Sequence, residues 1–182
     1  MQLANLGRYI VKKRPAFLIL IFLMILISSI KIFFFDIAIV NGNSMYPTLH
    51  NGDFLIVRKS ECPILIGDIV LLKLSSGDGM KKYAVKRVIA TGGDTVKIDY
   101  GNNNIYINGQ VIAEPYINYN QDDPMKQRDK QSITSFYVPD GYVFLMGDNR
   151  NYSTDSRNEE IGAISIEDVI GTVSIFIPAE SG

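Results

Sequence analysis

The sequence has few of the residues on which many active sites depend. Its 182 residues include one cysteine, Cys62, one histidine, His50, and no tryptophan. A single cysteine excludes an intrachain disulfide, and no set of residues has metal-ligand spacing, so we expect no metal and no cofactor. A Ser-His pair would have to use His50, but its place beside Asn51-Gly52 is more typical of a surface turn.

The net charge is also small. The formal net charge is -1 and the sequence pI is about 5.8. The sequence has no basic block outside residues 1–14, so a nucleic acid is not an expected partner.

A long apolar run follows that basic block. The run has no charge from Ala16 to Ile30, and after Lys31 it resumes as far as Phe35. At about 1.5 Å per residue, roughly 20 helical residues cross a hydrocarbon core of ~30 Å. We therefore predict one transmembrane signal anchor at residues 15–35, with Lys31 near its far end, where a long side chain carries its ammonium to the interface.

The basic residues before the run set its orientation. They predict a cytoplasmic segment at residues 1–14 and an extracytoplasmic domain at residues 36–182, in the plasma membrane. A cleavable signal peptide is the alternative, but its apolar region would be shorter, and no small-x-small site follows Ile30.

Beyond Asp36, short apolar runs alternate with turn residues, a pattern typical of an all-β domain. Asn108-Gly109 is a strong hairpin signal. Ser165 is placed to cap a short helix that reaches Val169, and the polar stretch 118–132 is predicted to be a solvated loop. The predicted strands are Ile37–Asn41, Phe54–Arg58, Ile69–Leu74, Tyr83–Ala90, Thr95–Asp99, Ile105–Asn108, Gln110–Ala113, Tyr142–Met146 and Thr172–Ile177.

Ser44 lies between the predicted span and this domain, and a serine acts as a nucleophile only with a base within about 3 Å. Side chains alternate along a strand, so Lys86 would share an otherwise apolar face with Ala84, Val88 and Ala90. Burial there would lower the pKa of the amine by several units. The alternative is an edge lysine that extends into water.

Three stretches in order resemble the type I signal peptidases, the bacterial leader peptidases. They are Ser44–Leu49 (Ser-Met-Tyr-Pro-Thr-Leu), Tyr83–Ala90 followed by Gly92-Gly93-Asp94, and Gly147–Arg157 (Gly-Asp-Asn-Arg-Asn-Tyr-Ser-Thr-Asp-Ser-Arg). The resemblance implies an antiparallel all-β catalytic domain on a membrane anchor, with Ser44 as nucleophile and Lys86 as general base. It also implies that Ser153 orients the lysine, that Asp148 pairs with Arg87, and that Asp155 pairs with Arg157.

Two positions differ from part of the family. Gram-negative members have a residue with a hydroxyl group two positions before the nucleophile. This chain has Gly42 there, as Gram-positive members do. The backbone N–H of Ser44 is then the first expected oxyanion donor, and a backbone N–H or a water would be the second. Tyr152 replaces an asparagine of many relatives.

Topology and resemblance together suggest the substrate. Ser44 lies roughly 9 residues beyond Phe35, hence within about 30 Å of the bilayer at ~3.3 Å per residue. We expect the protein to cleave preproteins whose signal peptides are inserted in the membrane, after Ala-x-Ala-like sites. The resemblance suggests that the extended substrate adds as a strand beside Val40–Asn43 and the Lys86 strand. The expected pocket residues, which could also be plain core residues, are Val40, Met45, Leu49, Ala84 and Val85.

Other classes fit less well. A non-catalytic, membrane-tethered assembly factor or chaperone of the same fold is the main alternative, and the presence of Lys86 argues against it. A sortase would need a cysteine site, but Cys62 is followed by Pro63 with no Thr-x-Thr-Cys pattern. Self-cleaving repressor-type serine-lysine proteases carry a DNA-binding domain where this chain has an apolar segment.

Overall fold

The computed structural model describes residues 15–29, 34–59, 63–75, 81–117, 123–127 and 132–179. The chain divides into two units, Met1–Asp36 and Ile37–Gly182, and each is described by itself. The predictions made for residues 1–14, for Lys31 and for Cys62 fall outside the described residues.

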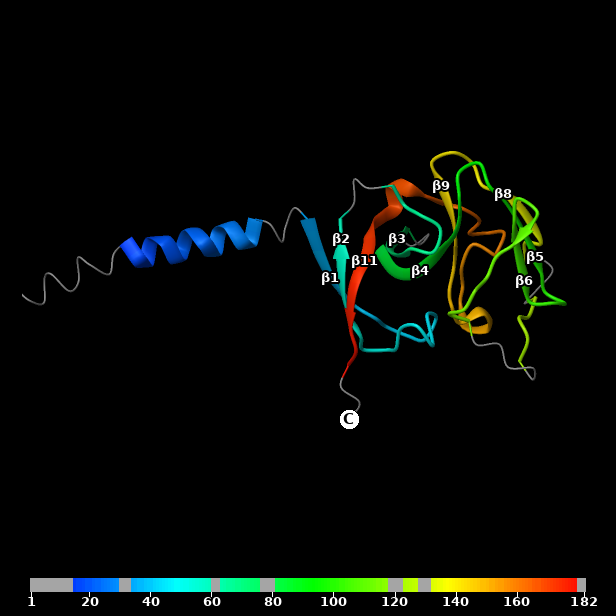
Figure 1. Cartoon of the computed structure of the whole chain (residues 1–182), viewed down its shortest axis with the longest axis horizontal. Helices are drawn as coiled ribbons and strands as arrows, with labels where there is room; N and C mark the ends of the chain where they lie inside the picture. The colour runs from blue at the N-terminus through cyan, green and yellow to red at the C-terminus, as the bar shows by residue number, and fades with distance from the viewer. Residues whose placement is uncertain are drawn as a thin grey trace, which may run out of the picture. The chain divides into compact units, whose positions relative to one another are not determined.

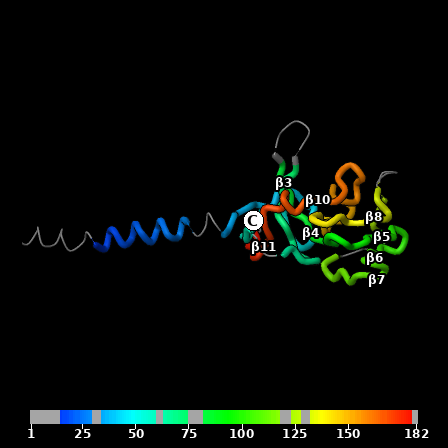
Figure 2. Tube along the Cα trace, turned by 90° about the horizontal axis from the view of Figure 1, so that it is seen from above, coloured from blue at the N-terminus to red at the C-terminus, as the bar shows by residue number. Residues whose placement is uncertain are grey.

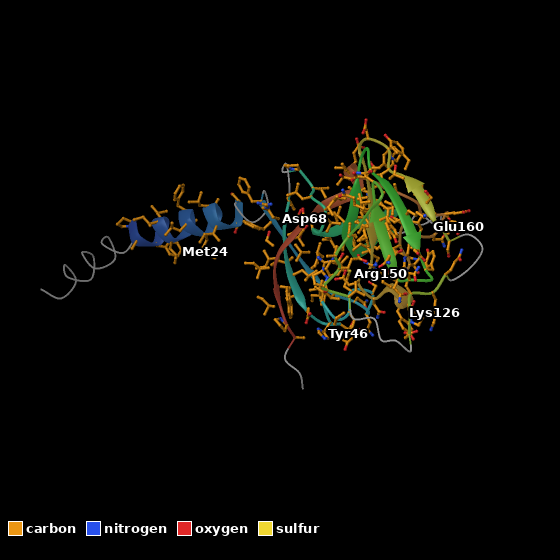
Figure 3. The ribbon with its side chains drawn as sticks, turned by 45° about the vertical axis from the view of Figure 1, so that its right-hand side comes forward. Met24, Tyr46, Asp68, Lys126, Arg150 and Glu160 are labelled. Carbon is orange, nitrogen blue, oxygen red and sulfur yellow. The ribbon has the colours of Figure 1, made fainter. Side chains whose placement is uncertain are left out.

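The N-terminal unit contains a helix at residues 15–29. Its apolar side chains, Met24 among them (Figure 3), are exposed all round, with Phe22 and Ile27 each 65% exposed. Among the described residues, no helix is long and apolar enough to cross a membrane. The predicted span at 15–35 includes residues 30–33, which the structure does not describe, and it stays a prediction.

The second unit is built of two antiparallel sheets (Figure 1). The larger has seven strands in the order β1-β2-β11-β3-β4-β9-β10, and the smaller has four in the order β7-β6-β5-β8. Figure 2 shows β5, β6, β7 and β8 gathered at one end of this unit. The strands are β1 (Phe35–Ile39), β2 (Phe54–Arg58), β3 (Ile69–Ser75), β4 (Lys81–Thr91), β5 (Thr95–Asp99), β6 (Asn104–Ile107), β7 (Gln110–Val111), β8 (Ser135–Tyr137), β9 (Tyr142–Met146), β10 (Ile164–Ser165) and β11 (Val169–Ile177).

The all-β, antiparallel prediction is confirmed, and all nine predicted strands exist. The Asn108-Gly109 hairpin is confirmed as well, since both residues have positive φ between β6 and β7. Ser165 caps a single 3-10 turn, η2 (Ile166–Asp168), and its Oγ accepts a hydrogen bond from the N–H of Glu167. In the predicted loop 118–132, the described residues 123–127 form neither helix nor strand.

The sequence did not predict β8 and β10. These strands have three and two residues, too few for a period-two pattern, and they form because β5 and β9 offer free edges for pairing.

The two sheets share a buried core at the ends of β4 and β9. Ile89 and Phe144 from the large sheet pack in one cluster with Val96 and Ile105 from the small sheet. A bulge between Val88 and Ala90 in the β4–β9 pairing shifts the alternation there. The next two residues, Ile89 and Ala90, therefore both join this cluster, and the predicted common face of β4 holds only as far as Val88.

Truncation in this shared core should destabilise the domain strongly. Phe144 is completely buried, so Phe144→Ala should lower the free energy of unfolding by about 3–5 kcal/mol, through lost burial and a cavity. Phe176→Ala is the matched control, because that ring is 45% exposed on β11 and its loss should cost much less. Denaturant unfolding of the full chain measures both. Equal losses in the two variants would contradict the role assigned to this core.

Candidate active site

Ser44 begins a tight turn between β1 and β2. The N–H of Leu49 donates to the carbonyl of Met45 at 2.9 Å, and both side chains are buried. On the outer side of the same turn, the rings of Tyr46 and His50 meet edge to face, with centroids 5.3 Å apart. The sequence therefore folds into one turn whose apolar side is anchored in the core and whose first residue, Ser44, is half-buried at the surface.

Lys86 reaches this serine from β4. Its Nζ lies 2.9 Å from Ser44 Oγ and 3.1 Å from the carbonyl oxygen of Val85, and the side chain is buried. Burial lowers the pKa of Lys86, and the Arg157 guanidinium lowers it further, while the carboxylates of Asp155 and Asp148 act in the opposite direction.

The segment after β9 holds the serine from the other side. The backbone N–H of Asn149 donates to the carbonyl of Ser44 at 3.0 Å, and the Asn149 amide donates to the carbonyl of Asn43 at 3.0 Å. A Cβ at Gly147 would overlap with that Ser44 carbonyl oxygen and with Ser153 Oγ. The close approach of Ser44 and this segment therefore requires a glycine at position 147.

Ser153 lies in this packed region without the expected bond. Its hydroxyl is buried and has no hydrogen-bond partner of acceptable geometry in the described part of the chain, and the amine of Lys86 bonds to Ser44 and Val85 instead. It nevertheless lies near enough to Asp155 to help lower the pKa of that carboxyl.

Both expected ion pairs are present and buried. Arg87 donates from Nε and Nη2 to the two oxygens of Asp148, at 2.8 and 2.7 Å, and Thr48 Oγ1 also donates to this carboxylate. Arg157 binds Asp155 in the same two-pronged way, at 2.8 and 2.9 Å. Although burial disfavours the Asp155 carboxylate, Arg157 and the N–H of Gly147 hold its pKa below the ordinary value.

A third buried pair was not predicted. Arg150 donates to Glu114 from Nη1 at 2.9 Å and to the carbonyl of Gly147 from Nε at 3.2 Å. Tyr116 bonds to the same glutamate, and its ring lies 3.8 Å from the guanidinium carbon of Arg87. Figure 3 places Arg150 among the side chains of the β-rich unit, whereas Lys126 lies at its periphery. No local pattern links Glu114 to a residue 36 positions later.

Asn51 is a second residue that sequence reasoning did not find. Its Oδ1 accepts a hydrogen bond from the N–H of Gly42 at 2.8 Å. Gly42 has φ +97°, a conformation that favours glycine, and its N–H is already used by this bond. In the described part of the chain, the N–H of Ser44 has no acceptor. The sequence signal, Asn51-Gly52, indicated only a turn.

The structure divides the five expected pocket residues between two faces of the large sheet. Val40, Met45, Leu49 and Val85 pack in one apolar cluster. Ala84 belongs to a different cluster, with Val70, Leu72 and Leu145, on the side of β4 that carries Lys86.

The arrangement can support acyl transfer without a metal ligand set. Among the residues that the structure describes, no group of three or more His, Cys, Asp or Glu side chains is placed to hold a metal ion. A hydroxyl in hydrogen-bond contact with an amine of lowered pKa is the geometry of an activated nucleophile and its base.

Comparison with known proteins identifies the class. The family model described as signal peptidase, peptidase S26, matches residues 13–177, so the chain belongs to the signal peptidase S26 family. It is 41% identical over 157 residues to signal peptidase I of Bacillus amyloliquefaciens and 40% identical over 157 residues to signal peptidase I T of Bacillus subtilis. Each alignment covers 82% of this chain and 77% of the relative. A crystal structure of a signal peptidase I from Enterococcus faecalis aligns with 63% of this chain and 100% of that chain, at 28% identity and a TM-score of 0.48.

Breaking the Arg87–Asp148 pair should be costly, because the guanidinium would stay buried without its counter-ion. Asp148→Ala should lower the free energy of unfolding by about 3–5 kcal/mol. Asp123→Ala is the control, since the Lys126–Asp123 pair is exposed and contributes about 0–1 kcal/mol. Thermal and denaturant unfolding compare the two variants, and an equally small loss in both would show that the buried pair contributes no more than a surface pair.

Proposed function

We propose that the protein is a membrane-bound signal peptidase that removes signal peptides from exported preproteins through a Ser44/Lys86 dyad. The observation that carries this proposal is the 2.9 Å contact between Lys86 Nζ and Ser44 Oγ, made by a buried lysine whose pKa is lowered. Membership of the signal peptidase family supports the reaction class.

In the proposed first step, the neutral amine of Lys86 takes the proton of Ser44 as Oγ attacks the scissile carbonyl. The negative charge that forms on the carbonyl oxygen is stabilised by the N–H of Ser44. Gly42 contributes the turn rather than a free N–H, because Asn51 accepts that bond. The ammonium of Lys86 then protonates the departing amine, and an acyl-enzyme remains on Ser44.

In the second step, Lys86 takes a proton from the water that attacks the ester. The Lys86 ammonium then gives this proton to Ser44 Oγ as the C–O bond breaks, which releases the signal peptide as a carboxylic acid and restores the neutral amine. Ser153 supports this step as a positioning residue. Its buried, unpartnered oxygen can accept a hydrogen bond from the lysine once the amine no longer contacts Ser44. The pairs Arg87–Asp148 and Asp155–Arg157 hold the surrounding backbone.

Substrate and location follow from the same proposal. The small side chains of an Ala-x-Ala-like site would pack against the apolar cluster of Val40, Met45, Leu49 and Val85, of which Val85 is the half-buried member. The exposed apolar helix at residues 15–29 supports a signal anchor over residues 15–35, with residues 36–182 outside the cytoplasm. The substrates are then signal peptides held in the same bilayer.

Loss of either dyad residue should abolish cleavage. Ser44→Ala and Lys86→Ala should each reduce kcat/KM on a model preprotein by about 100-fold or more, because general-base catalysis alone contributes 10²–10⁴. Ser135→Ala and Lys82→Ala are matched controls at exposed strand positions. Cleavage assays in detergent measure the effect. Near-normal activity in a folded Lys86→Ala variant would rule out this lysine as the base.

The lowered pKa of Lys86 also predicts a pH dependence. In the unfolded chain, Lys86 keeps its ordinary pKa near 10.5. At pH values between the lowered pKa of the folded state and 10.5, the unfolded state therefore binds more protons than the folded state. The free energy of unfolding then rises with pH across this range. Lys86→Met removes the cost of a buried cation. Its stability advantage over the wild type should therefore be largest below the lowered pKa and should vanish toward pH 10.5.

The same group should appear in the kinetics of the wild type. kcat/KM should fall on the acid side as Lys86 becomes protonated, with a midpoint below 10.5, because burial lowers the pKa of this amine. Unfolding at several pH values and pH–rate profiles measure the two effects. A stability difference between Lys86→Met and wild type that does not change with pH would show that the amine is not desolvated.

A further inference from the structure

The face of β4 that carries Lys86 also borders a narrow cleft outside the apolar cluster assigned to the signal peptide. The cleft is small, with a cavity volume of only about 10 Å³. Its walls are mainly aliphatic, with Leu74, Ala84, Leu145 and Ile161 among them, and its polar members are Lys86, Thr154, Asp155 and Ser156.

The cleft and the signal-peptide cluster lie on opposite faces of the same strand. Val85 packs with Met45 and Leu49, whereas its neighbour Ala84 packs with Leu72 and Leu145. This is the alternation of side chains along β4. Lys86 follows Val85 in the strand and lines the same cleft as Ala84.

Proton transfer requires the departing amine to come within hydrogen-bond reach of Lys86 Nζ. That amine belongs to the first residue of the mature protein. Side chains of an extended substrate also alternate, so a residue before the cut that points toward Met45 is followed by one that points to the opposite side. Both arguments bring the first mature side chain to the cleft.

We propose that this cleft is the subsite for the side chain of the first mature residue and that it selects a small aliphatic group. The inference rests on the proposed function. The aliphatic walls favour apolar side chains, and the small volume excludes large ones. Asp155 also lines the cleft, but both of its oxygens are bonded by Arg157, so a charged side chain would be buried there without a partner of its own.

Peptide substrates that differ only in the first mature residue test the proposal with the full-length enzyme in detergent. The set has Gly, Ala, Val, Leu or Lys at that position. In wild type, kcat/KM should rise about fourfold per buried carbon from Gly to Val, and Lys should be cut at least tenfold less efficiently than Val. The ratio Val:Gly is measured within one enzyme preparation, so the amount of folded protein cancels.

Two variants change the size of the cleft in opposite directions. Ala84→Leu fills it and should reduce the Val:Gly ratio to about one or less. Ile161→Ala widens it and should make Leu a better substrate than Val. Ser135→Leu, which adds a leucine at an exposed position on β8, is the control and should keep the wild-type ratios.

The outcomes separate this inference from the function on which it rests. Cleavage of the set by wild type, with ratios that neither Ala84→Leu nor Ile161→Ala changes, would overturn the subsite and leave the signal peptidase activity standing. Wild-type enzyme that cuts none of the peptides would overturn the proposed function, and the subsite would fall with it. Opposite shifts in the two variants, with Ser135→Leu unchanged, would establish the subsite.

Discussion

The burial of one amine is the constraint on which the rest of the site depends. A lysine can serve as a base near neutral pH only if its cation is disfavoured, and the carboxylates of Asp155 and Asp148 favour the cation of Lys86. Each of them is held by its own guanidinium, from Arg157 and Arg87. The two ion pairs therefore reduce the opposing charge around the lysine, and burial remains the larger influence on its pKa.

Strand alternation explains how adjacent residues of β4 serve different surroundings. Val85 faces the apolar cluster below Ser44, Lys86 faces the serine hydroxyl, and Arg87 reaches the carboxylate of Asp148. Because this period is a local property, the sequence alone predicted that Lys86 shares a face of β4 with Ala84 and Val88. It also predicted nine strands, since the alternation and the turn residues around Asn108-Gly109 are local signals.

What the sequence could not predict depends on contacts between distant segments. The pair Glu114–Arg150 forms only when the chain after β7 returns to the end of β9, and β8 and β10 exist only as partners of other edges. The bulge in β4 arises from its register with β9, so alternation failed at Ala90. Of the five expected pocket residues, Ala84 alone packs on the other face of β4, and the pocket itself stays a prediction.

The position of Ser44 is determined by the segment after β9 as much as by its own turn. The N–H of Asn149 holds the serine carbonyl, Gly147 allows the close approach, and Arg150 holds the carbonyl of Gly147 while bound to Glu114. Gly147 and Arg150 are buried, whereas Ser44 and Asn149 are half-buried, so the serine is held from its buried side. The 2.9 Å contact between Lys86 Nζ and Ser44 Oγ thus depends on two parts of the fold, β4 for the lysine and the Gly147–Arg150 segment for the serine.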